Sequence, residues 1–251
     1  MTDTPTTAAL ILIGDEILSG RIRDENLPYL THWLNERGVQ LREARVVPDI
    51  PGTIADAVNV CRHQFDYVFT TGGIGPTHDD VTADSIAQAL GVALDMHPDA
   101  YQMLQAHYPP GEFTPARQRM ARVPRGGRLI DNPISVAPGF VIENIYVLAG
   151  VPMIMRAMLD SLAHDSNGGA PARSITLRLD VAESRVADIL GQLQADRPGI
   201  SIGSYPFYVE GHVGVQVVFR GTDADALEDA AATLETRADR LGYGHDRVDL
   251  A

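Results

Sequence analysis

Two short, mainly apolar runs, each followed by glycine, limit the fold of this chain more than any other feature. Residues 8–13 form the first run and lead into Gly14, and residues 65–71 form the second and lead into Gly72 and Gly73. A run without regular polar alternation is typical of a strand buried on both faces, as in a parallel sheet. Both runs are therefore predicted to be strands of one parallel sheet.

Two segments with apolar residues at helical spacing lie between these runs. The first begins at Asn26 and ends near Gly38, and the second begins at Thr53; a strand over residues 39–47 separates them. Strand, helix, strand, helix, strand is the signature of a parallel sheet with crossover helices. The predicted fold is a doubly wound, three-layer α/β/α domain with a mostly parallel sheet.

The polar segment 164–172, which contains glycine and proline, is typical of a linker. It predicts a first domain over residues 1–168 and a second over residues 169–251. The second domain has the pattern of a strand, a helix, two strands and a helix, at residues 174–181, 183–195, 200–205, 213–219 and 223–241. This order, β-α-β-β-α, predicts a small α+β sandwich.

Charge and composition exclude several classes of function. The formal net charge is −13, and all 20 basic residues are arginines. A polyanion is repelled by such a chain, so no nucleic-acid partner is expected. Without lysine, a Walker-type phosphate loop and Schiff-base catalysis are excluded. Cys61 is the single cysteine, and no segment resembles a membrane span or a secretory signal, which predicts a cytoplasmic protein without membrane contact.

The segment 70–82, Thr-Thr-Gly-Gly-Ile-Gly-Pro-Thr-His-Asp-Asp-Val-Thr, carries the strongest local signal. It follows a predicted strand and precedes a helix, where glycine N–H groups and the helix N-terminus can bind a phosphate. A side chain at Gly73 is expected to intrude on that phosphate. The alternative is an ordinary strand-to-helix turn that Asp80 or Thr82 caps.

Carboxylates stand at the mouth of this loop and of the loop after the first strand. Asp79 and Asp80 would suit a divalent cation that bridges them to ligand phosphates, although either could be only a cap. Asp15 and Glu16 follow a buried strand, where a carboxylate is costly unless it meets donors, a cation or a ligand hydroxyl. Solvated carboxylates at a helix start are the alternative.

Two further loops, residues 132–140 and 149–152, have the composition of a binding site, though ordinary turns use the same residues. Together the loops predict one site at one edge of the sheet. The residues predicted to contact the ligand are Gly14, Glu16, Ser19, Gly20, Thr71, Gly72, Gly73, Gly75, Pro76, Thr77, Thr82, Asn132, Ser135, Pro138 and Gly139.

The string of motifs resembles the CinA family, in the order that the family uses. The matching segments are residues 14–20, Asn26, and residues 71–82, 121–124, 132–133, 137–140 and 150–152. Residues 8–160 look like the molybdopterin-binding-type domain shared with MoaB, Mog and the N-terminal part of some eukaryotic FAD synthetases. Residues 201–206 are similar to the family's KH-type domain. The amidase domain that often follows in the family has no counterpart in these 251 residues.

The resemblance implies hydrolysis of ADP-ribose by a pyrophosphatase that uses Mg²⁺, Mn²⁺ or Co²⁺. Asp80 and Asp15 would then be catalytic, and Asp79 and Asp80 would hold the metal. The alternative is a non-enzymatic protein that binds molybdopterin or a nucleotide and is related to molybdenum cofactor biosynthesis. A third alternative is an interaction module whose site has decayed. The first two readings imply a small-molecule pterin or nucleotide ligand. A homo-oligomer, preferably a dimer, is also expected.

Four positions depart from the family pattern within this resemblance. Ser135 and Val136 stand where the family usually has Gly-Thr, Ala149 stands where it has proline, and Ile154 stands where it has glutamate. Part of one binding wall is therefore expected to differ from that of the family.

Overall fold

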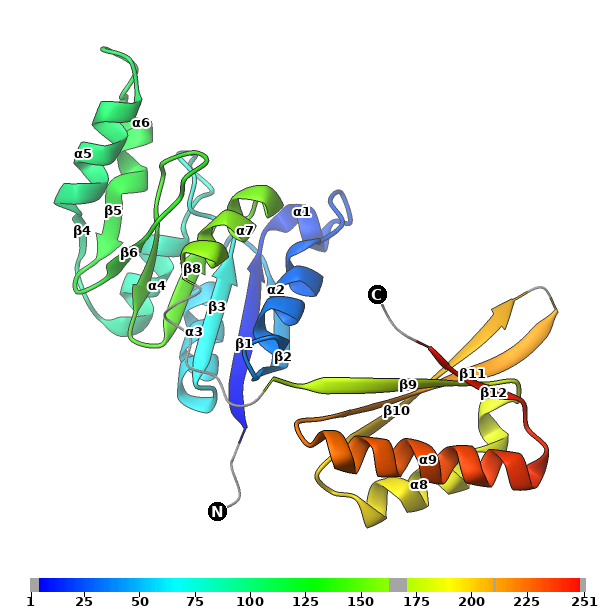
Figure 1. Ribbon diagram of the computed structural model, residues 1–251. Helices are drawn as coiled ribbons and strands as arrows, with labels where there is room; N and C mark the ends of the chain where they lie inside the picture. Colours follow the sequence, from blue (N-terminus) through cyan, green and yellow to red (C-terminus); the bar gives the residue numbers. More distant parts are fainter. Residues whose placement is uncertain (1–4, 163–170, 210, 249–251) are drawn as a thin grey trace. The chain divides into compact units, whose positions relative to one another are not determined.

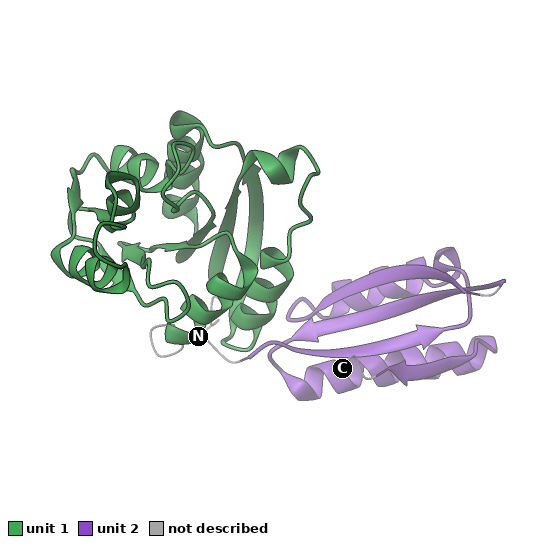
Figure 2. Cartoon of the chain, turned by 90° about the horizontal axis from the view of Figure 1, so that it is seen from above, with its two compact units in different colours: residues 1–169 green, residues 170–251 purple. Residues whose placement is uncertain are grey.

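The computed structural model describes residues 5–162, 171–209 and 211–248. The chain divides into two compact units, residues 1–169 and 170–251 (Figures 1 and 2). The predicted domain boundary after residue 168, and most of the predicted linker, lie outside the described residues.

Unit 1 is built on a six-stranded sheet with the strand order β2-β1-β3-β8-β7-β6. Its strands are β1 (Thr6–Ile13), β2 (Val39–Val47), β3 (Tyr67–Thr71), β6 (Arg128–Ile130), β7 (Gly139–Ile142) and β8 (Ile145–Leu148). The pairs β1–β2, β1–β3 and β3–β8 are parallel, whereas β7 pairs antiparallel with both β8 and β6. The prediction of a mostly parallel sheet is confirmed.

Helices cover both faces of this sheet, as a doubly wound fold requires (Figure 1). One face packs on α2 (Asn26–Asn35) and α7 (Pro152–Ser161) through a core that includes Leu10 and Leu12 of β1. The other face packs on α3 (Pro51–Gln64) and α4 (Thr82–Leu90), and its core includes Ile11 and Ile13. Successive residues of a strand point to opposite faces, so one uninterrupted apolar run supplies both cores.

Unit 1 has further elements besides the six-stranded sheet and the four helices named above. They are α1 (Asp15–Leu18), β4 (Leu94–Met96), α5 (Pro98–His107), α6 (Pro115–Gln118), η1 (Arg119–Ala121) and β5 (Arg122–Pro124). β4 and β5 form a separate antiparallel pair, and α5 packs on η1 through a small core of Ala100, Leu104 and Ala121. Among the described helices, none is long and apolar enough to cross a membrane.

Unit 2 is a four-stranded antiparallel sheet with two α-helices. Its elements are β9 (Arg173–Leu179), η2 (Glu183–Arg185), α8 (Ala187–Asp196), β10 (Ser201–Val209), β11 (His212–Gly221), α9 (Ala224–Leu241) and β12 (His245–Val248). The strand order is β10-β11-β9-β12. The predicted small α+β unit is confirmed, and the structure adds β12, a strand that the sequence analysis missed.

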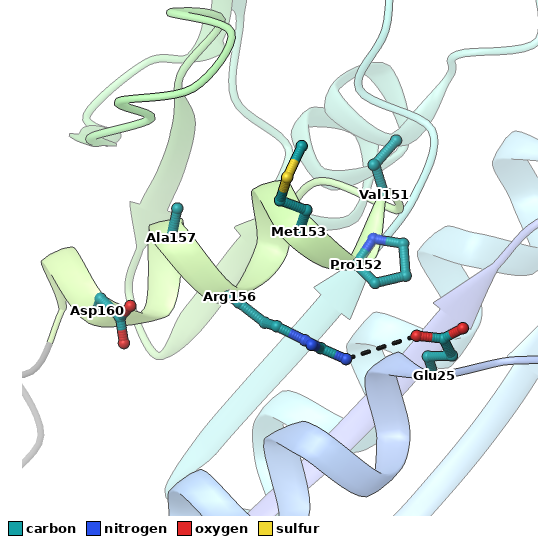
Figure 3. Close-up of a pocket in the computed structure, with 7 residues that line it drawn as sticks. All are labelled: Glu25, Val151, Pro152, Met153, Arg156, Ala157 and Asp160. Atoms are coloured by element: carbon teal, nitrogen blue, oxygen red, sulfur yellow. Dashed lines mark hydrogen bonds and ion pairs between the residues drawn. The ribbon is translucent and has the colours of Figure 1, made fainter.

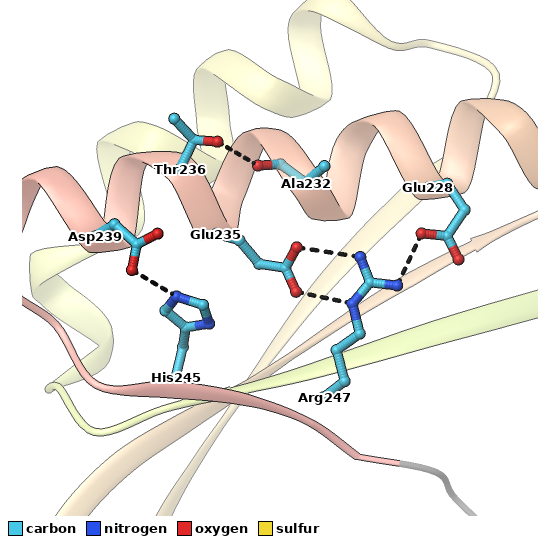
Figure 4. A network of polar contacts seen from close by, with 7 residues as sticks. All are labelled: Glu228, Ala232, Glu235, Thr236, Asp239, His245 and Arg247. Carbon is cyan, nitrogen blue, oxygen red and sulfur yellow. Dashed lines mark hydrogen bonds and ion pairs between the residues drawn. The ribbon is translucent and has the colours of Figure 1, made fainter.

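Polar contacts with α9, rather than an apolar pattern, accompany this last strand (Figure 4). Arg247 donates from Nε and Nη2 to the two carboxylate oxygens of Glu235, at 2.8 and 3.1 Å, and from Nη1 to Glu228 at 2.8 Å. The hydrogen bonds from Arg247 lower the pKa of the Glu235 carboxyl. β12 reads His-Asp-Arg-Val, which lacks the apolar alternation of a recognisable strand.

Candidate functional site

A pocket of about 470 Å³ opens at the carboxyl ends of β1, β3 and β8. In open α/β sheets this edge is where ligands bind. The pocket brings together nine of the predicted site residues, which are Glu16, Thr71, Gly72, Gly73, Gly75, Pro76, Asp80, Asn132 and Ser135. Those that do not line it are Gly14, Asp15, Ser19, Gly20, Thr77, Asp79, Thr82, Pro138 and Gly139.

The two adjacent glycines of the pocket are required by close packing of the backbone. Gly72 has φ +104°, and a Cβ atom there would collide with the carbonyl oxygen of Ile13. Gly73 has φ +65°, and its Cβ would collide with Oγ1 of Thr82. A side chain at Gly73 would therefore strike Thr82 first, which is a different reason for glycine from the predicted intrusion on a phosphate.

Neither Thr82 nor Asp80 caps α4, so the cap that the alternative for the loop expected is wrong. Thr82 is fully buried and its hydroxyl donates to the carbonyl oxygen of Gly72 at 2.9 Å. The carboxylate of Asp80 accepts from the Thr77 N–H at 2.7 Å and from the Thr77 hydroxyl. The N-terminus of α4 has no side-chain cap. These bonds close the loop on itself, and the N–H of Thr82 at the start of α4 donates to the carbonyl oxygen of Gly73 at 3.0 Å.

The loop after β1 sends one of its two carboxylates into the pocket. Glu16 is half-buried and lines the pocket, and no described residue donates a hydrogen bond to its carboxylate. Asp15 is exposed and lies outside the pocket, where its N–H donates to Asp49 at 2.9 Å. The carboxylate oxygens of Glu16 are not buried, so Glu16 is open to water and is suited to a cation or a ligand donor.

Asp49, two residues after the end of β2, was missed by the sequence analysis. Burial raises the pKa of its carboxyl, and the negative charges of Glu16, Asp15 and Asp79 raise it further, against the opposing effect of the Asp15 N–H. A lone aspartate after a strand carries no sequence signal. Asp49 adds a fourth carboxylate to Asp15, Glu16 and Asp79 at this edge of the sheet.

The charges that line the pocket are mostly negative. Its walls carry four carboxylates, Glu16, Asp24, Glu25 and Asp80, and one basic side chain, Arg23. Among the described residues, no group of three potential metal ligands is preformed. Asp79 was predicted to be a metal ligand together with Asp80. Its side chain is exposed, and its Oδ1 lies 3.8 Å from Nδ1 of His78. A phosphate in this pocket would therefore need a cation to offset the carboxylates.

Asn132 shapes the third loop with all of its polar atoms. Its Oδ1 accepts from the N–H groups of Ile134 and Ser135, both at 3.1 Å, and its Nδ2 donates to Ser135 Oγ and to the carbonyl oxygen of Ala137, both at 2.7 Å. The loop also holds Val136 at φ 65°, a conformation that a β-branched residue rarely adopts. Asn132 therefore sets the form of this wall.

The remaining wall comes from the fourth loop and from the start of α2. The carbonyl oxygen of Gly150 accepts from Nδ2 of Asn26 at 2.8 Å. A Cβ atom on Gly150 would lie 3.1 Å from the Cα of Gly72, so the two glycine backbones are in contact. Asn26 was part of the family motif but was not predicted to line the pocket.

A second pocket of about 500 Å³ continues from this wall along α7 (Figure 3). Glu25, Val151 and Pro152 line both pockets. In the second one, Arg156 of α7 points toward Glu25, and their charged groups are 3.5 Å apart. Besides this exposed ion pair, the side chains that line the second pocket are mostly apolar.

Comparisons with known proteins agree with this geometry. The family described as "Probable molybdopterin binding domain" matches residues 9–166, and the family described as "FAD synthase, middle domain" matches residues 171–241. The KH-type label for unit 2 stays a prediction, because the match there is to a different family.

Individual relatives cover most of the chain. A protein of Archaeoglobus fulgidus is 32% identical over 226 residues, which are 90% of this chain and 95% of the relative. The CinA-like protein of Citrifermentans bemidjiense is 32% identical over 254 residues, and the match spans 60% of its length. The crystal structure of the protein CinA from Thermoplasma acidophilum, of unknown function, is 34% identical, with a TM-score of 0.62 over 64% of this chain and 98% of that one.

Proposed function

The chain belongs to the CinA family and carries its molybdopterin-binding-type domain, and from this premise we propose that it binds a phosphate-bearing pterin or nucleotide. The ligand would occupy the pocket at the carboxyl ends of β1, β3 and β8. The protein would act as a binding protein related to molybdenum cofactor biosynthesis, with a pterin of molybdopterin type as the first candidate ligand.

The observation that carries this proposal is the form of the glycine loop. Gly72, Gly73 and Gly75 line the pocket with main-chain atoms. Helix α4 begins at Thr82, and its N-terminus has no side-chain cap. Backbone N–H groups in such a loop, together with a helix N-terminus, favour an anion. The pocket volume of about 470 Å³ lies within the range of small-molecule sites.

The proposal includes a divalent cation, because a phosphate would otherwise face four carboxylates and one arginine. Glu16, which lacks a donor, and Asp80 fit this role as oxygen ligands for Mg²⁺ or Mn²⁺. The phosphate of the ligand would complete the coordination, since the protein alone offers no preformed group of three ligands among its described residues. The cation would supply charge neutralisation.

Hydrolysis of ADP-ribose is the second candidate function. The expected need for a cation favours it, since hydrolysis of a pyrophosphate also depends on metal-assisted charge neutralisation. It ranks second because Asp15, one of the two predicted catalytic residues, is exposed and lies outside the pocket. Asp80 remains as the candidate that would position the metal.

Titration calorimetry and thermal unfolding with a pterin monophosphate, AMP and ADP-ribose test the proposal, each with Mg²⁺ and with EDTA. We expect at least one ligand to bind with Mg²⁺ and to raise the unfolding midpoint, since a ligand at a hundredfold its Kd stabilises the native state by about 2.7 kcal/mol. EDTA should weaken binding, and Glu16→Gln should reduce that difference. Failure of all three ligands to bind would refute the proposal. Release of AMP from ADP-ribose would place hydrolysis first.

Assembly and the absence of a nucleic-acid partner stay predictions. The expected homo-oligomer, preferably a dimer, would be measured by sedimentation. The formal charge of −13 is the reason for expecting no nucleic-acid partner.

A further inference from the structure

We propose that Asn26 determines ligand specificity by accepting a hydrogen bond from an exocyclic amino group of the ligand's heterocycle. This inference rests on the proposed function, because it concerns a ligand in the same pocket. It names a chemical requirement that the glycine loop does not impose, namely an amino group on the ring. The phosphate seat alone would accept any phosphate ester of suitable size.

Asn26 is a buried residue with half of its amide group unused. It is 4% exposed and lines the pocket. Its Nδ2 donates to the carbonyl oxygen of Gly150 at 2.8 Å, whereas its Oδ1 is buried without a partner. The amide cannot be reversed, because reversal would place two oxygen atoms at that distance. The unpaired atom of the Asn26 amide is therefore its oxygen, Oδ1, which can only accept a hydrogen bond.

The contrast with Asn132 shows that the free acceptor is not a general property of this pocket. Both asparagines are nearly fully buried and line it. The amide of Asn132 uses its oxygen and its nitrogen twice each within its own loop. A buried acceptor that is left unpaired has lost its hydrogen bonds to water without replacement, which destabilises the folded protein. Of the two asparagines, only Asn26 has an unpaired buried acceptor. An unpaired acceptor in a pocket wall is expected where a bound ligand supplies the missing donor.

A second unpartnered group lies on the same wall. Oγ1 of Thr71 is buried without a partner, and Thr71 lines the pocket. Thr71 precedes Gly72, Gly72 contacts Gly150, and Gly150 accepts the bond from Asn26. Asn26 and Thr71 are therefore linked through the backbones of Gly150 and Gly72, and each carries an unpartnered oxygen atom. A ring edge with an amino group and an adjacent acceptor would satisfy both.

The shared chemistry is an exocyclic amino group beside a ring acceptor, which pterins, guanine and adenine all possess. Asn26 Oδ1 is shielded from water in this structure, so the amino group must press into the wall to reach it. A hydrogen bond made there would be protected from solvent and correspondingly strong. A ring without the amino group would leave Asn26 Oδ1 unpaired.

Three pairs of ligands, each differing by one amino group, test this inference by calorimetry in the presence of Mg²⁺. They are a pterin monophosphate and its 2-deamino analogue, GMP and IMP, and AMP and purine riboside monophosphate. For each pair that binds, we expect the amino compound to bind roughly tenfold more tightly, as one such hydrogen bond allows. The pair with the largest ratio would identify the class of ring.

Asn26→Leu should bring that ratio close to one. A residue that only held Gly150 in place would weaken both members of a pair equally and leave the ratio unchanged, so an unchanged ratio would overturn the inference. Equal binding of both members by the wild-type protein would also overturn it, whether or not the variant folds. If none of the six compounds binds, the proposed function itself fails.

Discussion

The hydroxyl of Thr82, fully buried at the start of α4, donates a hydrogen bond to the carbonyl oxygen of Gly72 at 2.9 Å. We expect Thr82→Val to lower the free energy of unfolding of unit 1 by about 1–3 kcal/mol, because the variant leaves a buried carbonyl without its donor. Thr82→Ser keeps the hydroxyl and is the control. Urea unfolding measures both, and equal stability of the Ser and Val variants would show that the bond contributes little.

We expect substitutions at Gly73 and Thr82 to have coupled effects on the free energy of unfolding, because a Cβ on Gly73 would collide with Thr82. Gly73→Ala should lower the free energy of unfolding by more than about 2 kcal/mol. The new Cβ collides with Thr82 Oγ1, and the φ of +65° at Gly73 is unfavourable for alanine. In a Thr82→Ala background the collision is gone, and only the backbone cost of about 1 kcal/mol should remain. A double-mutant cycle measures the difference. Additive effects would mean that the loop relaxes away from Thr82 without cost.

Thr70 and Thr71 provide a matched pair within one strand. Both are buried with an unpartnered hydroxyl, but only Thr71 lines the pocket. Replacing either by valine removes a buried unpaired polar group, so we expect stability to stay equal or rise by about 1 kcal/mol in both variants. Ligand affinity should fall several-fold in Thr71→Val alone. Parallel behaviour of the two variants in calorimetry would assign Thr71 to the core.

Asp49 predicts a dependence of stability on pH. Because burial and neighbouring carboxylates raise the pKa of this group in the folded state, its ionisation opposes folding. The unfavourable contribution is absent below the ordinary pKa of an aspartate and fully present above the raised one. Asp49→Asn should therefore be more stable than wild type at pH 7, and the difference should shrink toward about pH 4. A difference that is constant with pH would exclude titration of Asp49 as its cause.

The sequence predicted the parallel core of the fold because apolar patterning acts locally. Residues 8–13 and 65–71 are recognisable as strands buried on both faces from their own apolar residues, without information about the strands they pair with. β12 was missed because its contacts with α9 are ion pairs, which leave no apolar period in four residues. α3 begins at Pro51 rather than at the predicted Thr53, since proline suits the first turn of a helix.

The glycine loop of the site was also predictable, whereas the partners of single polar residues were not. The sequence placed Thr71, Gly72 and Gly73 in the site because composition and position agree there, and the structure brings them into the pocket. Asn26 and Gly150 are 124 residues apart, so their hydrogen bond has no local signal. Asn at a helix start suggests a cap, but Asp24 accepts the N–H groups of Asn26 and Leu27 instead.

The contact between Gly72 and Gly150 joins two loops of the pocket through main chain alone. A Cβ on Gly72 would strike the carbonyl oxygen of Ile13, whereas one on Gly73 would strike the hydroxyl of Thr82. Three of the four departures from the family pattern, Ser135, Ala149 and Ile154, line the same pocket. Under the proposed function, substitutions at such positions would change which ring is accepted, while the main-chain contacts to the phosphate would be kept.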